Sequence, residues 1–140
     1  MMNVETVERM FSSVNQMISI TIPSTSSKLK KMGYMFYSCY ALENIDLSKM
    51  NTSNVTDMRF MFYNCSSLKT IDLSMFNTKK VNSMAYMFSN CRELKRLDLS
   101  NFETPNLRYT NQMFDACQKL EYLDISSFNT SNVFNMKEMF

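Results

Sequence analysis

Carboxylates and thiols are the side chains in this sequence that could do chemistry, and both recur every 26 residues. Aspartate recurs at Asp46, Asp72, Asp98 and Asp124. Cysteine recurs at Cys39, Cys65, Cys91 and Cys117. The chain has no histidine, which is the usual general base, and a single glycine, so a glycine-rich phosphate loop is excluded. Because the carboxylates form a row and not a converging pair, we predict that the protein is not an enzyme and takes no cofactor.

The aspartate row raises an electrostatic problem. Carboxylates stacked about 5 Å apart on adjacent strands repel one another by about 1 kcal/mol per pair even in water. Backbone N–H groups, the neighbouring Arg96 or hydroxyl groups two residues further on could offset this repulsion. Those hydroxyls belong to Ser48, Ser74, Ser100 and Ser126. Three interpretations stay open, namely structural hydrogen bonds, cation binding along the row and direct contact with a ligand.

The cysteine row predicts a structural role. Neighbouring cysteines would lie within disulfide distance, but side chains of one row point in parallel, whereas a disulfide needs converging Cβ atoms. The paired CxxC spacing of zinc sites is absent. We therefore predict a ladder of small buried side chains and no metal site, with a redox or metal-binding role as the alternative.

One half of each repeat predicts a short helix. The apolar residues Val55, Met58, Met61, Phe62 and Cys65 are spaced like one stripe of a helix. A threonine suited to an N-cap precedes the stripe in every full repeat, at Thr52, Thr78, Thr104 and Thr130. Pro105 follows Thr104, and proline is favoured at the first helical position. The helices should therefore begin near residues 53, 79, 105 and 131.

The other half of each repeat predicts a strand of four or five residues. Ile71 and Leu73 alternate with Thr70 and Asp72, and the same alternation recurs in the other full repeats. Identical connections between identical strands require a parallel sheet with the helices on one side. We predict an α/β repeat fold, a leucine-rich-repeat-like solenoid with one short parallel strand and one short helix per 26-residue turn.

The repeat boundaries predict one solenoid domain spanning residues 1–140. Residues 1–9 are a lead-in, residues 10–34 form a degenerate first repeat, and residues 139–140 begin a further repeat. The full repeats are 35–60, 61–86, 87–112 and 113–138. Residue Phe140 falls where a helix would close, so we also expect an uncapped C-terminal face that associates end to end with another copy.

The charge and hydropathy pattern exclude two classes of partner. A formal net charge of +2 is too small to indicate nucleic-acid binding. No apolar run approaches the ~18 residues of a membrane helix, so no membrane insertion is expected. Residues 1–17 also lack the uninterrupted apolar region of a signal peptide.

The residues that differ between repeats are the candidates for binding. On the predicted sheet, variable side chains flank the aspartate row, and together they form our candidate face: Asn44, Asp46, Thr70, Asp72, Arg96, Asp98, Tyr122 and Asp124. The variable positions are either a recognition surface or unconstrained solvent-facing sites. The predicted helix side carries a loose aromatic band that could also meet a partner: Tyr34, Phe60, Tyr86, Tyr109 and Phe134.

The amino-acid sequence of the repeats resembles that of a known family. The units MFYNCSSLKTIDLSMFNT and MFSNCRELKRLDLSNFET are similar to BspA-like leucine-rich-repeat surface proteins, particularly the 25–26-residue mycoplasma type described as a domain of unknown function. The similarity extends over residues 10–140. It implies a solenoid at the cell surface or secreted, linked to adhesion, with no established catalytic residue. No signal peptide or anchor accompanies it in this chain, and without the resemblance the expected location is cytoplasmic.

Two functional hypotheses follow. The first is a non-enzymatic adhesion-type module that presents a concave parallel-sheet face to a protein or glycan partner. The second is an intracellular structural or scaffolding repeat protein with no adhesive role. An export signal or anchor in the full gene would favour the first, and a complete reading frame beginning at Met1 would favour the second.

Overall fold

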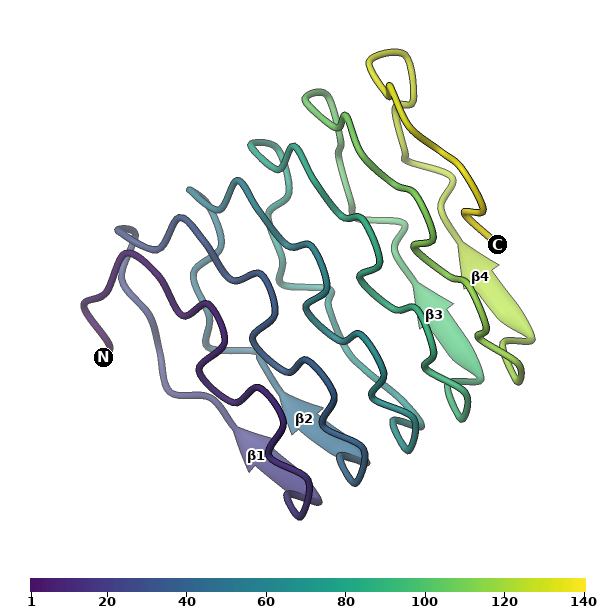
Figure 1. The fold of residues 1–140 in the computed structure, drawn as a ribbon. Helices are drawn as coiled ribbons and strands as arrows, with labels where there is room; N and C mark the ends of the chain where they lie inside the picture. The colour runs from purple at the N-terminus through teal and green to yellow at the C-terminus, as the bar shows by residue number, and fades with distance from the viewer.

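Successive repeats wind into coils that lie side by side, so that equivalent residues of neighbouring repeats are adjacent (Figure 1). The computed structural model describes residues 1–140. Its regular elements are four short strands, β1 (Ser19–Thr21), β2 (Asn44–Asp46), β3 (Arg96–Asp98) and β4 (Tyr122–Asp124). β1 pairs with β2 and β3 pairs with β4, both in parallel, with Ile20 opposite Ile45 and Leu97 opposite Leu123.

The predicted helices are wrong, and with them the α/β fold class. The structure contains no helix, and residues 53–64 run as a wavy ribbon, as the corresponding segments do in the other coils (Figure 1). An α-helix with its side chains is about 10–12 Å wide, whereas paired strands lie only about 4.8 Å apart. Coils that keep the strand spacing on both sides of the stack have no room for a helix.

Backbone hydrogen bonds between coils take the place of the hydrogen bonds that the predicted helices would have formed within one segment. The N–H groups of Phe60 and Phe62 donate to the carbonyls of Ala85 and Met87 in the next coil, both at 2.9 Å. The alternate N–H groups, such as that of Tyr63, donate to the carbonyl three residues earlier in their own coil. Every N–H from residue 60 to 65 is thus satisfied without a helix. We call the segments 31–39, 57–65, 83–91 and 109–117 the turn face.

A row of isolated parallel bridges runs along the turn face. It joins one residue of every coil in the order Thr6, Lys31, Asp57, Ser83, Tyr109 and Asn135. On the opposite side of the stack lies the strand face, which we define as residues 19–21, 44–46, 70–72, 96–98 and 122–124. The stack therefore has two hydrogen-bonded faces where the sequence predicted a sheet covered by helices.

The ribbon requires left-handed backbone at two positions in each coil. One position is taken by Arg9, Tyr34, Phe60, Tyr86, Gln112 and Glu138. The other is taken by Ser13, Ser38, Asn64, Asn90 and Ala116. All these residues have φ between 52° and 63°, and none is a glycine. Such residues cannot continue a right-handed helix, which explains the tight turns at these points.

The sheet on the strand face is interrupted. Residues 70–72 of the third coil form no strand, so the continuous sheet expected from the sequence becomes two separate pairs. The side-chain amide of Asn101 reaches from the fourth coil and donates to the carbonyls of Leu73, Ser74 and Phe76 at 3.0–3.2 Å. A side chain thus connects the third and fourth coils directly after the segment in which the strand pairing is missing.

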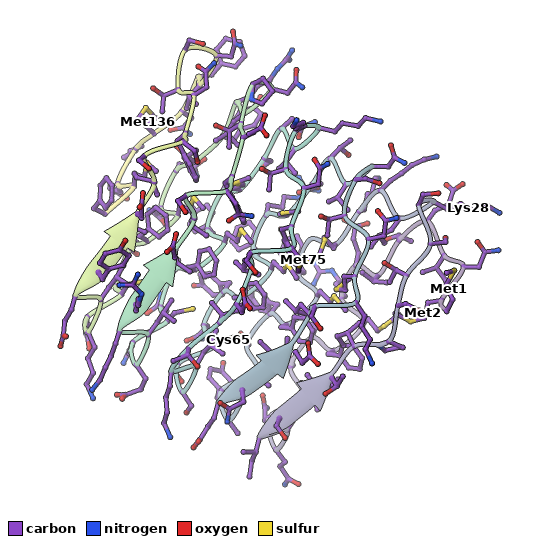
Figure 2. The ribbon with its side chains drawn as sticks, turned by 180° about the vertical axis from the view of Figure 1, so that it is seen from behind. Met1, Met2, Lys28, Cys65, Met75 and Met136 are labelled. Atoms are coloured by element: carbon purple, nitrogen blue, oxygen red, sulfur yellow. The ribbon has the colours of Figure 1, made fainter.

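The core fills the space between the two faces and is ordered into columns. The rings of Phe11, Phe36, Phe62, Phe88, Phe114 and Phe140 form one stack, with neighbouring centroids 5.4–6.1 Å apart. A second stack joins Phe76, Phe102 and Phe128. Figure 2 shows side chains throughout the stack, with Met1 near one end, Met136 near the other and Cys65 between them.

Three of the four threonines predicted to be helix N-caps, Thr52, Thr78 and Thr104, bridge coils instead, whereas the hydroxyl of the exposed Thr130 makes no hydrogen bond. The Thr52 hydroxyl donates to the Asn77 carbonyl at 3.1 Å and accepts the Asn77 N–H at 2.8 Å. Thr25 and Thr104 make the same pair of bonds to the following coil. These hydroxyls are buried, and each is satisfied both as a hydrogen-bond donor and as an acceptor. No helix in the structure is long and apolar enough to cross a membrane.

The left-handed positions allow a stabilising substitution. Ala116 has φ 55°, where a residue with a Cβ loses about 1–2 kcal/mol, whereas glycine is unstrained. Glycine also costs about 0.5–1 kcal/mol in unfolded-state entropy, so we expect Ala116→Gly to raise the free energy of unfolding by about 0.5–1 kcal/mol. Urea unfolding measures this. The matched control is Ala85→Gly. Ala85 is buried and does not have a positive φ, so this variant should be less stable than the parent protein. Equal destabilisation of both variants would contradict the interpretation.

Candidate binding face

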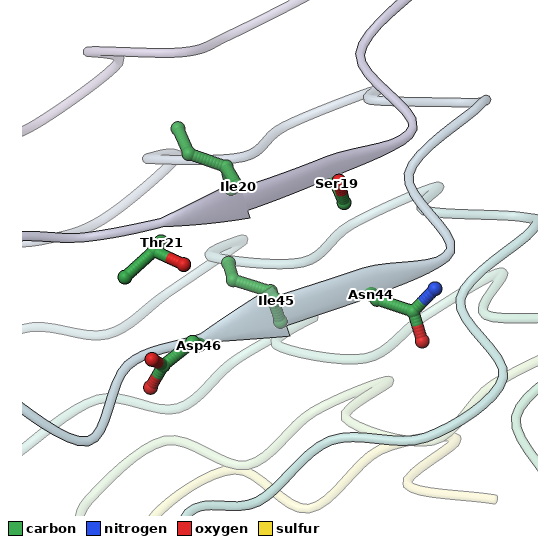
Figure 3. Close-up of a pocket in the computed structure, with 6 residues that line it drawn as sticks. All are labelled: Ser19, Ile20, Thr21, Asn44, Ile45 and Asp46. Carbon is green, nitrogen blue, oxygen red and sulfur yellow. The ribbon is translucent and has the colours of Figure 1, made fainter.

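The strand face presents polar side chains to solvent because each strand alternates. Ile20 and Ile45 point the same way, while Thr21, Asn44 and Asp46 project away from them (Figure 3). Together with Ser19 these residues line an open hollow of about 340 Å³. The alternation that predicted strands thus places the variable residues outward, as the sequence suggested.

Each aspartate of the row is held by the serine two residues further on. Asp46 Oδ1 accepts hydrogen bonds from the Ser48 backbone N–H at 2.9 Å and from its hydroxyl at 2.7 Å. Asp98 accepts both bonds from Ser100, at 3.1 and 2.7 Å. Asp72 and Asp124 accept the backbone N–H groups of Ser74 and Ser126. These bonds favour the charged carboxylates and offset their mutual repulsion.

The serine bonds lower the pKa of every aspartate in the row. For Asp98, the hydroxyl and N–H of Ser100 lower the pKa, and the nearby Asp124 carboxylate only partly opposes this. For Asp72, the Ser74 N–H is the largest cause of the lowered pKa. The four carboxylates therefore share one environment, whereas acid–base catalysis uses carboxyl groups whose environments separate their pKa values.

Arg96 connects the side chains of β3 and β4. Its guanidinium lies 3.5 Å from the centroid of the Tyr122 ring and 3.5 Å from an Asp98 carboxylate oxygen. The Tyr122 hydroxyl lies 3.5 Å from Asp124 Oδ2. Arg96, Asp98, Tyr122 and Asp124, which we call the Arg96 group, thus form one connected cluster. The side chains of Asn44 and Thr70 are exposed and make no side-chain hydrogen bond, so the structure does not join them to this group.

A second hollow lies beside the Arg96 group. It has a volume of about 290 Å³, and its lining includes Ile71, Asp72, Asp98 and Asn101. It coincides with the interruption of the sheet between the third and fourth coils. The sequence contained no signal for this hollow, because residues 70–72 follow the same pattern as the strands beside them.

The four cysteines lie in one column without disulfides. The thiols of Cys39, Cys65, Cys91 and Cys117 donate to the carbonyls of the phenylalanines one coil back, at 3.0–3.2 Å. Burial raises the pKa of all four thiols, and that of Cys117 to about 11. The structure contains no group of three or more His, Cys, Asp or Glu side chains that could hold a metal ion. Sequence spacing placed the column but could not show these thiol–carbonyl bonds.

The aromatic band expected on the helix side is only partly one surface. Tyr34, Phe60 and Tyr86 stack on the turn face, with ring centroids 4.7 and 4.4 Å apart. Tyr37 and Tyr63, which were not among the predicted aromatic residues, stack on each other with ring centroids 5.0 Å apart and contact Phe60. Their 26-residue spacing was the signal that could have found them. Tyr109 and Phe134 lie in other columns and are not part of this stack.

The end face formed by residues 113–140 exposes apolar side chains. Phe140 stacks on Phe114, yet 72% of its surface is exposed. With Cys117 and Leu120 these rings line an open hollow of about 310 Å³. End-to-end contact through this face stays a prediction.

Equivalent side chains recurring in register along a stack of coils define a repeat protein. The chain belongs to the family described as "Mycoplasma protein of unknown function, DUF285", whose model matches residues 1–96 and again residues 30–140. Comparison with curated proteins found no match, and comparison with solved structures found none.

The aspartate–serine bonds predict an acid-sensitive fold. A pKa that is lowered in the folded state stabilises the fold above the unfolded value, near 3.8, and this stabilisation is lost as the pH falls through the folded pKa. We expect the urea midpoint to drop as the pH is lowered below about 4, and to drop less in Asp98→Asn. Glu121→Gln, at an exposed carboxylate that makes no hydrogen bond or ion pair, should follow the parent protein. An unchanged pH profile in Asp98→Asn would refute the assignment.

The buried thiols predict low chemical reactivity. With a thiol-specific disulfide reagent at pH 8, Cys65 and Cys91 should stay unmodified in the native protein, because they are fully buried and protonated. Cys117 should react slowly, and all four should react in denaturant. Lys49→Cys, which places a thiol at an exposed position, is the positive control. Rapid native modification of Cys65 or Cys91, located by peptide mapping, would be inconsistent with the buried column.

Proposed function

We propose that the protein is a non-enzymatic binding module, similar in role to BspA-like adhesion proteins, and that its strand face binds a protein or glycan partner. The observation that carries this proposal is the Arg96 group. It places a guanidinium, a phenol ring and two carboxylates together on exposed strands. Arginine and tyrosine are enriched among the residues that dominate protein interfaces.

The contacts within the Arg96 group support the same role. Arg96 is held between the Tyr122 ring and the Asp98 carboxylate, while Ser100 holds Asp98. A side chain already held in one position loses less conformational entropy when a partner binds. Arg96 and Tyr122 lie in a column that differs between repeats, whereas the aspartate column beside them and the phenylalanine and cysteine columns of the core recur. A stack of this kind can change its exposed residues without changing its core.

The resemblance to surface repeat proteins supports a location at the cell surface or outside the cell. The family description names no activity and no partner. The shared environment of the aspartates supports a binding role over a catalytic one. We propose an exposed glycoprotein as the partner class, contacted through protein or glycan.

Binding to an array of purified serum and extracellular-matrix glycoproteins tests the proposal. We expect Arg96→Ala and Tyr122→Ala each to weaken the affinity for a captured glycoprotein at least about tenfold, as interface anchors do. Arg92→Ala and Tyr40→Ala, at exposed residues outside the strand face, are the matched controls. Unchanged affinity in the strand-face variants, loss in the controls, or no binding across the array would reject the proposal.

A further inference from the structure

We propose that a second binding site, for a neutral pyranose residue of a glycan, lies on the turn face beside Tyr109. This site is separate from the strand face and does not rest on the function proposed for it. A hollow of about 320 Å³ spans three coils there, and its lining includes Asp57, Arg59, Phe60, Asn82, Tyr109 and Asn111. That volume is at the lower end of the range for small-molecule sites.

Tyr109 supplies a free aromatic surface. The other turn-face tyrosines have rings stacked against their neighbours. Tyr122 on the strand face is covered by Arg96. Tyr109 makes no contact with another aromatic ring or with a cationic side chain, and 45% of its surface is exposed. The face of an aromatic ring is electron-rich and attracts the weakly positive C–H groups that one side of a pyranose ring presents.

Two free amides stand in the same hollow. The side chains of Asn82 and Asn111 form no hydrogen bond within the protein, although each offers two donors and one acceptor. The hydroxyl of Tyr109 is also without a hydrogen bond to another residue. Pyranose hydroxyls donate and accept, so they match groups of both kinds. A hollow with a free ring and a few convergent polar groups has the composition expected of a ligand site.

The charges of the hollow select a neutral ligand. Asp57 and Arg59 are its only charged lining residues, and they pair at 3.1 Å between Arg59 Nε and Asp57 Oδ2. Asp57 Oδ1 also accepts the Arg59 backbone N–H at 3.0 Å, which holds the pair in place. The formal charges cancel. A phosphate or a uronic acid would therefore find no net opposite charge here.

The site occurs once along the stack. The positions equivalent to Tyr109 are Thr6, Lys31, Asp57, Ser83 and Asn135, and none of these is aromatic. An aromatic ring, the paired charges of Asp57 and Arg59 and the two free amides are therefore combined in only one hollow of the turn face. The expected stoichiometry is one pyranose per chain.

Saturation-transfer NMR on residues 1–140 tests the site, with methyl β-D-glucopyranoside, methyl β-D-galactopyranoside and methyl N-acetyl-β-D-glucosaminide as probes. We expect transfer to at least one probe, strongest at the ring C–H protons, with one-site saturation. Tyr109→Ala should weaken binding at least about fivefold, while Tyr109→Phe, which keeps the ring, should stay within about twofold. Asn82→Ala, at an exposed amide without a structural partner, should weaken binding and leave the urea midpoint unchanged.

Two controls distinguish the pyranose site on the turn face from partner binding by the strand face. Tyr40→Ala removes a tyrosine of matched exposure outside the hollow and should bind like the parent protein. Arg96→Ala, which disrupts the strand face, should also leave pyranoside binding unchanged. Absence of transfer to all three probes, or equal transfer in the parent protein, Tyr109→Ala and Asn82→Ala, would overturn the site. Loss of transfer in Arg96→Ala would place the sugar on the strand face.

Discussion

The backbone hydrogen bonds between neighbouring coils of the turn face are the constraint on which the rest of the structure depends. Each coil offers alternate N–H groups to the next, and the remaining N–H groups close tight turns within the coil. This arrangement keeps the turn face at the same narrow spacing as the strand pairs. The phenylalanine rings, the thiol–carbonyl bonds and the threonine bridges all require equivalent residues of neighbouring coils to lie within contact distance.

The backbone conformation of the turn face has a free-energy cost that side-chain contacts offset. A left-handed residue with a Cβ costs about 1–2 kcal/mol, and each coil contains two of them. At Tyr34, Phe60 and Tyr86 the rings stack on one another, and an aromatic pair contributes about 0.5–1.5 kcal/mol beyond the area it buries. In the last two coils the same position holds Gln112 and Glu138, whose side chains form a hydrogen bond with each other.

The two faces differ in the chemistry they leave exposed. On the strand face, serines fix the aspartates, and the Arg96 group is the part with the greatest variety of functional groups. On the turn face most aromatic rings stack on one another. The unstacked ring of Tyr109 and the side-chain amides of Asn82 and Asn111 therefore remain available to a ligand. Both surfaces include side chains that change from coil to coil, such as Arg96, Tyr122 and Tyr109, while the phenylalanine and cysteine columns of the core repeat.

The sequence by itself determined the 26-residue period, the columns of Phe, Cys and Asp, and the outward position of the variable residues, because these follow from spacing and polarity. Only the tertiary structure decided that residues 53–64 form a ribbon, that Thr52 bridges coils and that the sheet is interrupted at residues 70–72. The spacing of Val55, Met58, Met61, Phe62 and Cys65 shows which side chains are buried. It does not show whether a backbone N–H is bonded within its own segment or to the next coil, and that choice separates a helix from this ribbon.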